Sequence, residues 1–130
     1  MRAAAPRREI GTSPVDSYET TLRKLAVPDD EFVESALADD EANLRHSALD
    51  PKTHALVRLG ALVAAQAPSA SFLWTIEAAL EAGATRREIV GTLVAVMPAI
   101  GTAPVAAAAP RIGIALGYDV AAALGTRRTA

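Results

Sequence analysis

The stretch ALEAGATRREIV, residues 79–90, contains the signals for the end of one helix and the start of the next. Gly83 suits the residue after a helix, because glycine accepts the left-handed backbone found there. Thr85 and Glu88 have the spacing of a capping box, in which each side chain bonds the other's backbone N–H. We therefore predict a helix that stops at Gly83 and a second helix that opens at Thr85.

Similar signals occur on the N-terminal side of this stretch. Asp50 and Pro51 combine a favoured N-cap residue with proline at the first helical position. The helix that they open is predicted over 52–66, and its apolar side chains on nearly every side favour a central position. A serine is then expected to cap the following helix, and both Ser69 and Ser71 are suitable.

Prolines and further caps divide the C-terminal part. The helix that opens with the capping box is expected to end around Pro98. Thr102 is predicted to cap a helix over 102–116, which Pro110 should kink or split. Asp119 is predicted to cap a last short helix.

The N-terminal part has weaker signals. From Pro14, apolar residues recur at three- and four-residue spacing and predict an amphipathic helix that Pro28 ends. Asp29 or Asp30 can cap a second short helix. The polar stretch 38–47 is expected to be a connector with about one helical turn, and His46 within it is expected at the surface.

Together these signals predict an all-α fold of six to eight helices. No segment shows the two-residue alternation of a strand, and the chain has no Asn-Gly or Asp-Gly turn. We expect a single helical domain over 14–125, between a flexible N-terminal arm, 1–13, and a C-terminal tail, 126–130.

Composition excludes several classes of function. The net charge of −2 and the lack of a basic stripe argue against nucleic-acid binding. No uninterrupted apolar run is long enough to cross a membrane, and no signal peptide is evident, so a cytoplasmic protein is expected. The absence of cysteine excludes disulfide and thiolate chemistry. Two distant histidines make no metal site, and no glycine-rich phosphate loop is present.

The stretches 49–57 (LDPKTHALV) and 79–90, followed by Gly101, resemble the carboxymuconolactone decarboxylase / alkylhydroperoxidase-D family. The resemblance implies that family's compact multi-helix fold, a homo-oligomer (commonly a trimer or hexamer) and a reaction without cofactors. The family's redox members carry Cys-x-x-Cys and a histidine at positions that correspond to Pro68, Ser71 and Thr75 here. Decarboxylase members usually keep the histidine. Peroxidase activity is excluded, since no thiolate is available to attack a peroxide.

Two charged or titratable residues on the 52–66 helix are candidates for a site. Arg58 lies among apolar neighbours and could hold a substrate carboxylate, or it could form a structural ion pair with Glu77 or Glu34 across a subunit interface. His54, one turn earlier, could be a general base, or it could be a surface residue in the first turn.

The helix before Gly83 supplies the remaining candidates. Ser71 and Thr75 share a face and could hydrogen-bond a ligand, or Ser71 could cap the helix while Thr75 bonds back to a carbonyl. Glu77 could be an acid or base if Trp74 shelters it, or it could face solvent. Trp74 could line a pocket or fill a subunit contact.

The leading hypothesis is a cofactor-free lyase or isomerase. It would act by proton transfer on a small anionic substrate that bears a carboxylate or carbonyl group. In this hypothesis Glu77 and His54 move protons, and Arg58, Ser71, Thr75 and Trp74 bind the substrate. The second hypothesis is a non-catalytic oligomeric protein that binds small molecules or serves as a scaffold, and that has kept the fold without its chemistry.

Overall fold

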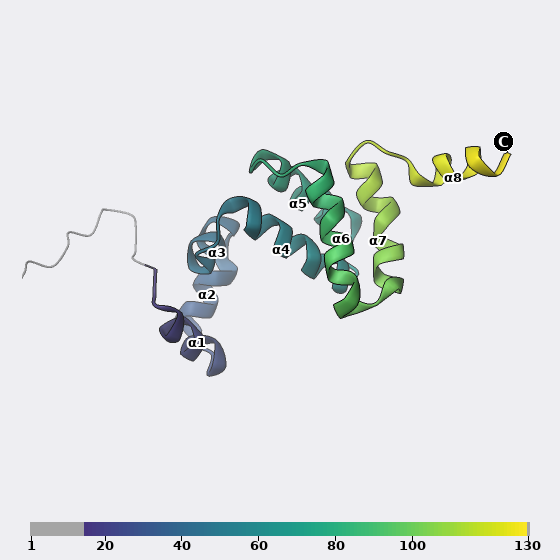
Figure 1. Cartoon of the computed structure of the whole chain (residues 1–130). Coiled ribbons are helices and arrows are strands. Elements are labelled where there is room, and N and C mark those ends of the chain that lie inside the picture. Colours follow the sequence, from purple (N-terminus) through teal and green to yellow (C-terminus); the bar gives the residue numbers. More distant parts are fainter. Residues whose placement is uncertain (1–14, 130) are drawn as a thin grey trace, which may run out of the picture. The chain divides into compact units, whose positions relative to one another are not determined.

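The computed structural model describes residues 15–129, and their side chains as far as Gly125 (Figure 1). The described part is helical throughout, without a strand, which confirms the predicted all-α class. Its helices are α1 (Tyr18–Ala26), α2 (Asp30–Ala38), α3 (Asp40–Ser47), α4 (Pro51–Ala64), α5 (Ser69–Glu81), α6 (Arg86–Ile100), α7 (Thr102–Ala115) and α8 (Val120–Thr129).

The chain forms two compact units, Met1–Leu49 and Asp50–Ala130. This division does not test the single domain expected over 14–125, which stays a prediction. The expected arm, 1–13, falls outside the described residues, and the expected tail, 126–130, is helical as far as Thr129.

In the first unit, aspartates open the second and third helices. Asp29 accepts a hydrogen bond from the Phe32 N–H at 2.9 Å, and Asp39 accepts one from the Ala42 N–H at 2.7 Å. The connector predicted over 38–47 is therefore wrong, because most of it is α3. Acidic residues in the first turn and basic residues in the last turn complement the helix dipole. Ala42 is the only buried residue of α3, so no apolar period revealed this helix.

His46, expected at the surface, is half-buried against α2. Its Nε2 lies 2.7 Å from Ser35 Oγ, and its ring meets the Phe32 ring edge-on with the centroids 5.1 Å apart. The polar composition around His46 concealed this contact, which depends on the helical form of α3.

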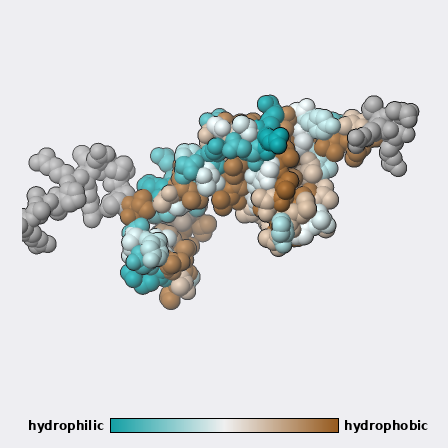
Figure 2. All heavy atoms as spheres, viewed as in Figure 1, coloured by the Kyte–Doolittle hydropathy of each residue, from teal (hydrophilic) through white to brown (hydrophobic). Residues whose placement is uncertain are grey.

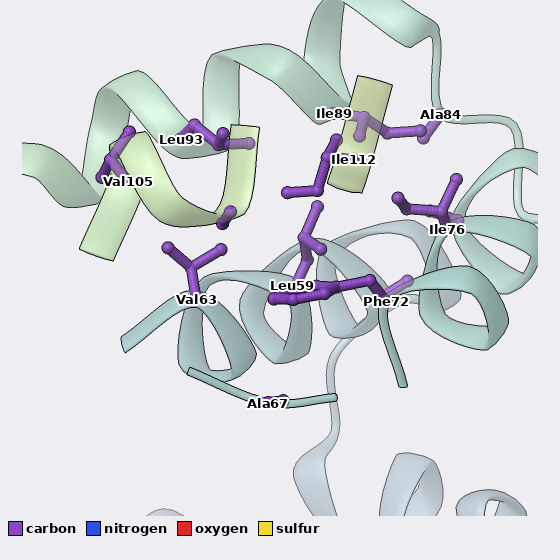
Figure 3. Close-up of a cluster of buried hydrophobic side chains, with 13 residues drawn as sticks. Leu59, Val63, Ala67, Phe72, Ile76, Ala84, Ile89, Leu93, Val105 and Ile112 are labelled. Atoms are coloured by element: carbon purple, nitrogen blue, oxygen red, sulfur yellow. The ribbon is translucent and has the colours of Figure 1, made fainter. Parts of the chain in front are cut away.

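The second unit has its core among α4, α5, α6 and α7 (Figure 3). Each of these four helices contacts the other three, so the core is shared among them and the predicted central position of α4 stays a prediction. The fully buried side chains in this core with the largest volumes are Phe72, Leu59, Ile76, Ile89, Ile112 and Val63. They pack beside several buried alanines, so the helices approach each other closely.

The predicted helix signals around residue 83 are confirmed. Gly83 has a φ of +93°, the left-handed geometry that favours glycine. In the capping box, the Glu88 N–H donates to the Thr85 hydroxyl at 3.0 Å, and the Thr85 N–H donates to the Glu88 carboxylate at 3.0 Å. Asp50 caps α4 as predicted, and Asp119 accepts from the Ala122 N–H at the start of α8.

Other helix ends differ from the prediction. Neither predicted serine caps α5, whose N-cap is Pro68 without a side-chain bond. Helix α6, expected to end around Pro98, ends two residues later at Ile100. Helix α7 is not split at Pro110.

Candidate functional site

Helices α4 and α5 form an antiparallel pair joined by the short segment 65–68. Arg58 lies six positions before the end of α4 at Ala64 (64 − 58), and Thr75 lies six positions after the start of α5 at Ser69 (75 − 69). The two residues are therefore at the same level of the pair. The Arg111 guanidinium from α7 donates to the carbonyl of the joining segment at 3.1 Å and helps to fix it.

On α4, the structure places the two candidate residues on one side of the helix. His54 is buried, with 8% of its surface exposed, so the alternative of a surface histidine is wrong. Arg58 lies one turn further along and is half-buried. Buried Ala55 and Leu59 follow them directly in the chain and belong to the core. The site therefore borders the core and is partly shielded from water.

On α5, Thr75 is buried, with 9% of its surface exposed, and Ser71 is half-buried one turn before it. Because Pro68 is the N-cap, Ser71 is not engaged as a cap. The alternative role for Thr75 was a hydrogen bond from its hydroxyl back to a carbonyl one turn earlier. Thr92 on α6 makes a bond of this kind, from its hydroxyl to the Glu88 carbonyl at 3.1 Å. Within residues 15–129, the Thr75 hydroxyl makes no bond of this kind.

Glu77 and Trp74 lie apart from these residues. Glu77 is exposed and is two residues from Thr75, which places the two side chains on opposite sides of the helix at about 100° per residue. Trp74 is 69% exposed. Within one chain, the indole therefore does not enclose Glu77 in a dry pocket. His54 and Arg58 therefore share one side of α4, and Ser71 and Thr75 share one side of α5. The exposed Glu77 and Trp74 lie on the outer side of α5.

An ion pair connects the start of α4 with the start of α6. Lys52 Nζ lies 3.1 Å from a Glu88 carboxylate oxygen. Hydrogen bonding from the Thr85 backbone N–H, followed by the Lys52 contact, lowers the pKa of Glu88 below its usual value. The Thr53 hydroxyl and backbone N–H likewise lower the pKa of Asp50. The Asp50 carboxylate stabilises the start of α4, and the Glu88 carboxylate stabilises the start of α6. His54 lies in the first turn of α4, close in sequence to the first of these caps.

Three of the hollows in the described part of the chain lie in different places. One of about 170 Å³ lies in the first unit between α1, α2 and α3. An open, shallow groove of about 650 Å³, lined by residues of α6 alone, lies on the outer side of that helix. A hollow of about 400 Å³ lies between α6, α7 and the start of α8. None of the three is lined by His54, Arg58, Ser71 or Thr75. The sequence did not predict the groove on α6, because its position depends on which side of α6 the other helices cover.

The described residues hold no group of three or more metal-ligating side chains. None of their helices is both long and apolar enough to cross a membrane. The core cluster of the second unit is wholly apolar and contains no carboxylate.

Comparison with known proteins gives one match. The model of the carboxymuconolactone decarboxylase family matches residues 30–111, from the start of α2 into α7. Neither the curated proteins nor the solved structures contain a match to this chain. The matched range includes all six residues that the sequence singled out.

Proposed function

Because the chain belongs to the carboxymuconolactone decarboxylase family, we propose that it is a cofactor-free enzyme of the lyase or isomerase type. It acts on a small substrate that bears a carboxylate or a carbonyl group. The observations that support this proposal are the buried His54 one turn from the half-buried Arg58 on α4, and the buried Thr75 on α5, a helix that contacts α4.

Each residue of this group has a distinct role in the proposal. His54 transfers the proton, since an imidazole titrates near neutral pH, at ~6.5 when unperturbed. The Arg58 guanidinium binds a carboxylate or an enolate-like oxygen with two parallel N–H bonds. The hydroxyls of Ser71 and Thr75 bind the remaining oxygens of the substrate.

In a decarboxylation, the bond between carbon and carboxylate breaks and carbon dioxide leaves. The electron pair of that bond moves toward a conjugated carbonyl oxygen, and protonated His54 then delivers a proton to carbon. Arg58 accelerates this step most if it binds the oxygen on which negative charge develops, because that contact strengthens in the transition state. In an isomerisation, His54 removes a proton from one carbon and returns it to another.

Three further properties belong to the same proposal. The enzyme is a cytoplasmic homo-oligomer, a trimer or a hexamer, and it uses no cofactor. Glu77 and Trp74 have no part in the chemistry within one chain, because they lie on the outer side of α5. The absence of cysteine leaves no route to a thiol-dependent peroxidase reaction.

The proposal is tested by steady-state kinetics with a panel of carboxylated lactones and related enol acids, with carbon dioxide release as the readout. His54→Gln should lower kcat by about 100-fold or more, as expected for loss of a general acid or base. The matched control is His46→Gln, in the first unit, which should leave kcat unchanged. Arg58→Met should lower kcat/KM, and Arg23→Met on α1 should not.

Equal turnover by the wild type and His54→Gln would contradict the proposed role of His54. Binding of these acids without turnover, detected as a raised Tm, would favour the second hypothesis of a non-catalytic binding protein.

A further inference from the structure

The hollow between α6, α7 and the start of α8 is a second candidate site, which we call the α6–α7 pocket. Figure 2 shows apolar and hydrophilic patches side by side on the second unit. The pocket has a volume of about 400 Å³, which lies in the range of small-molecule sites. Its apolar walls come from all three elements and are formed by Val90, Leu93, Ala109, Ile112, Leu116 and Val120. The second unit therefore contains a partly enclosed space of ligand size.

A close approach at Gly113 fixes one wall of the α6–α7 pocket. The Tyr118 N–H donates to the Gly113 carbonyl at 2.8 Å. A Cβ placed on Gly113 would lie 2.7 Å from the Tyr118 carbonyl oxygen and 2.9 Å from the Val120 side chain. Gly117, with a φ of +85°, supplies the left-handed backbone that turns the chain between them. The turn over 117–120 is therefore held against α7, so this wall is part of the fold itself.

Two polar side chains, Arg86 and Tyr118, line the α6–α7 pocket, and both are exposed at its edge. The Arg86 Nε–H donates a long hydrogen bond, 3.4 Å, to the Leu116 carbonyl at the end of α7. This bond holds the guanidinium beside the pocket and leaves its two terminal nitrogens for another acceptor. No carboxylate lines the pocket, and Arg86 forms no ion pair with the described part of the chain. The pocket therefore presents a cation without a counter-charge.

The walls and the charge together indicate the chemistry of a ligand. Apolar walls require an apolar body, and the Arg86 guanidinium can bind a carboxylate with two parallel N–H bonds. Arg86 is also the first residue of α6, so the positive end of the helix dipole adds to the attraction for an anion. A space with walls from three elements suits a compact molecule, whereas a partner helix would need an open groove.

We propose that the α6–α7 pocket binds a small apolar monocarboxylate. The apolar body of this ligand lies among the side chains of α6, α7 and α8, and its carboxylate binds the Arg86 guanidinium. One guanidinium balances one carboxylate, so the bound pair is neutral. Neither His54 nor Arg58 lines this pocket. The inference therefore adds a second binding site to the chain and is independent of the reaction proposed for His54.

The test is isothermal titration calorimetry of the full chain with 2-naphthoate, a rigid apolar acid with a single carboxylate. The wild type should bind it saturably. Arg86→Met should raise the dissociation constant by about tenfold or more, as expected for loss of a charge-assisted hydrogen bond. The matched control is Arg87→Met, because Arg87 is the next residue of α6 and is exposed but does not line the pocket. This control should leave the dissociation constant nearly unchanged.

Two further comparisons separate the charge contact from the apolar contact. Neutral 2-naphthamide should bind the wild type and Arg86→Met equally, because it lacks the carboxylate. Ala109→Phe fills the pocket and should abolish binding of both compounds. Val94→Phe is its control, on the exposed side of α6 and outside this pocket, and should bind both compounds as the wild type does. Far-ultraviolet circular dichroism should show the same helix content for all variants.

A wild type that does not bind 2-naphthoate would overturn the inference. So would equal losses of affinity in Arg86→Met and Arg87→Met, or undiminished binding by Ala109→Phe. His54→Gln should bind 2-naphthoate as the wild type does. If His54→Gln loses binding while Arg86→Met keeps it, the acid occupies the site on α4 and α5, which contradicts the inference and supports the proposed function. Loss of turnover in His54→Gln with unchanged binding of 2-naphthoate would support both.

Discussion

Two threonines that have the same role in the sequence prediction differ in the structure. Thr85 is the N-cap of α6 and accepts the Glu88 N–H. Thr102 was predicted to cap α7, but the N-cap is Gly101, with a φ of +84° and no side-chain bond. Thr102 is instead the first residue of α7. The backbone of Gly101 therefore decides which residue can cap, and local composition does not reveal it.

This difference predicts unequal costs of substitution. Thr85→Ala should lower the free energy of unfolding by about 0.5–2 kcal/mol, because the capping bond is lost. Thr102→Ala, the matched control, should change it by less than about 0.5 kcal/mol. Urea unfolding followed by circular dichroism measures both values. Equal losses for the two variants would contradict the assigned caps.

The pKa of Glu88 predicts a pH dependence of stability. Because this pKa is lower in the folded chain, Glu88 stabilises the fold above its ordinary pKa, ~4.3, and this contribution is lost as pH falls through the folded value. Glu88→Gln should therefore be less stable than the wild type near neutral pH, and the difference should shrink toward pH ~3. If the stability difference between Glu88→Gln and the wild type stayed constant from neutral pH to pH ~3, the charge of the Glu88 carboxylate would not contribute to stability.

At the scale of elements, the packing of one side of α4 against the core predicts a strong contrast between two of its residues. Leu59 is fully buried, while Val57 is 57% exposed. Leu59→Ala should lower the free energy of unfolding by about 2–5 kcal/mol, through lost burial and a residual cavity. Val57→Ala should change it by less than about 0.5 kcal/mol. Chemical denaturation of both variants provides the comparison, and similar losses would contradict the assigned packing.

Helices with strong punctuation were predictable, and those without it were not. Asp50 with Pro51 and the Thr85–Glu88 box each fixed a helix start. Helix α3 escaped prediction because dipole and capping interactions stabilise it, with Ala42 as its only buried residue. Pro110 suggested a kink or a split in α7, but the helix is not split, and its contacts with α4, α5 and α6 favour its continuing through the proline.

At the scale of the whole molecule, the two compact units differ in their cores. Among the described residues of the first unit, only Phe32 and Ala42 are buried, whereas the second unit contains the large apolar cluster. A fragment of residues 50–130 should therefore unfold cooperatively on heating, and a fragment of residues 1–49 should not. Circular dichroism melting of both fragments tests this. A cooperative transition in the shorter fragment would contradict it.

The candidate site was predictable in part. Its residues came from polar positions in apolar helices and from the family's motif, which indicated Ser71 and Thr75. Their burial was not predictable, because His54 in a first turn is ordinarily exposed, while the structure buries it. Conversely, Glu77 and Trp74 share a helix with Thr75, but its rotation places them on the outer side.

The central claim is that His54 transfers a proton to or from substrate carbon. The most direct measurement follows deuterium entering that carbon by nuclear magnetic resonance, in heavy water, with the wild type and His54→Gln compared on the same carboxylated lactone. We predict deuterium incorporation by the wild type and a loss of about 100-fold or more in the variant. Incorporation at the same rate in both proteins would contradict the account.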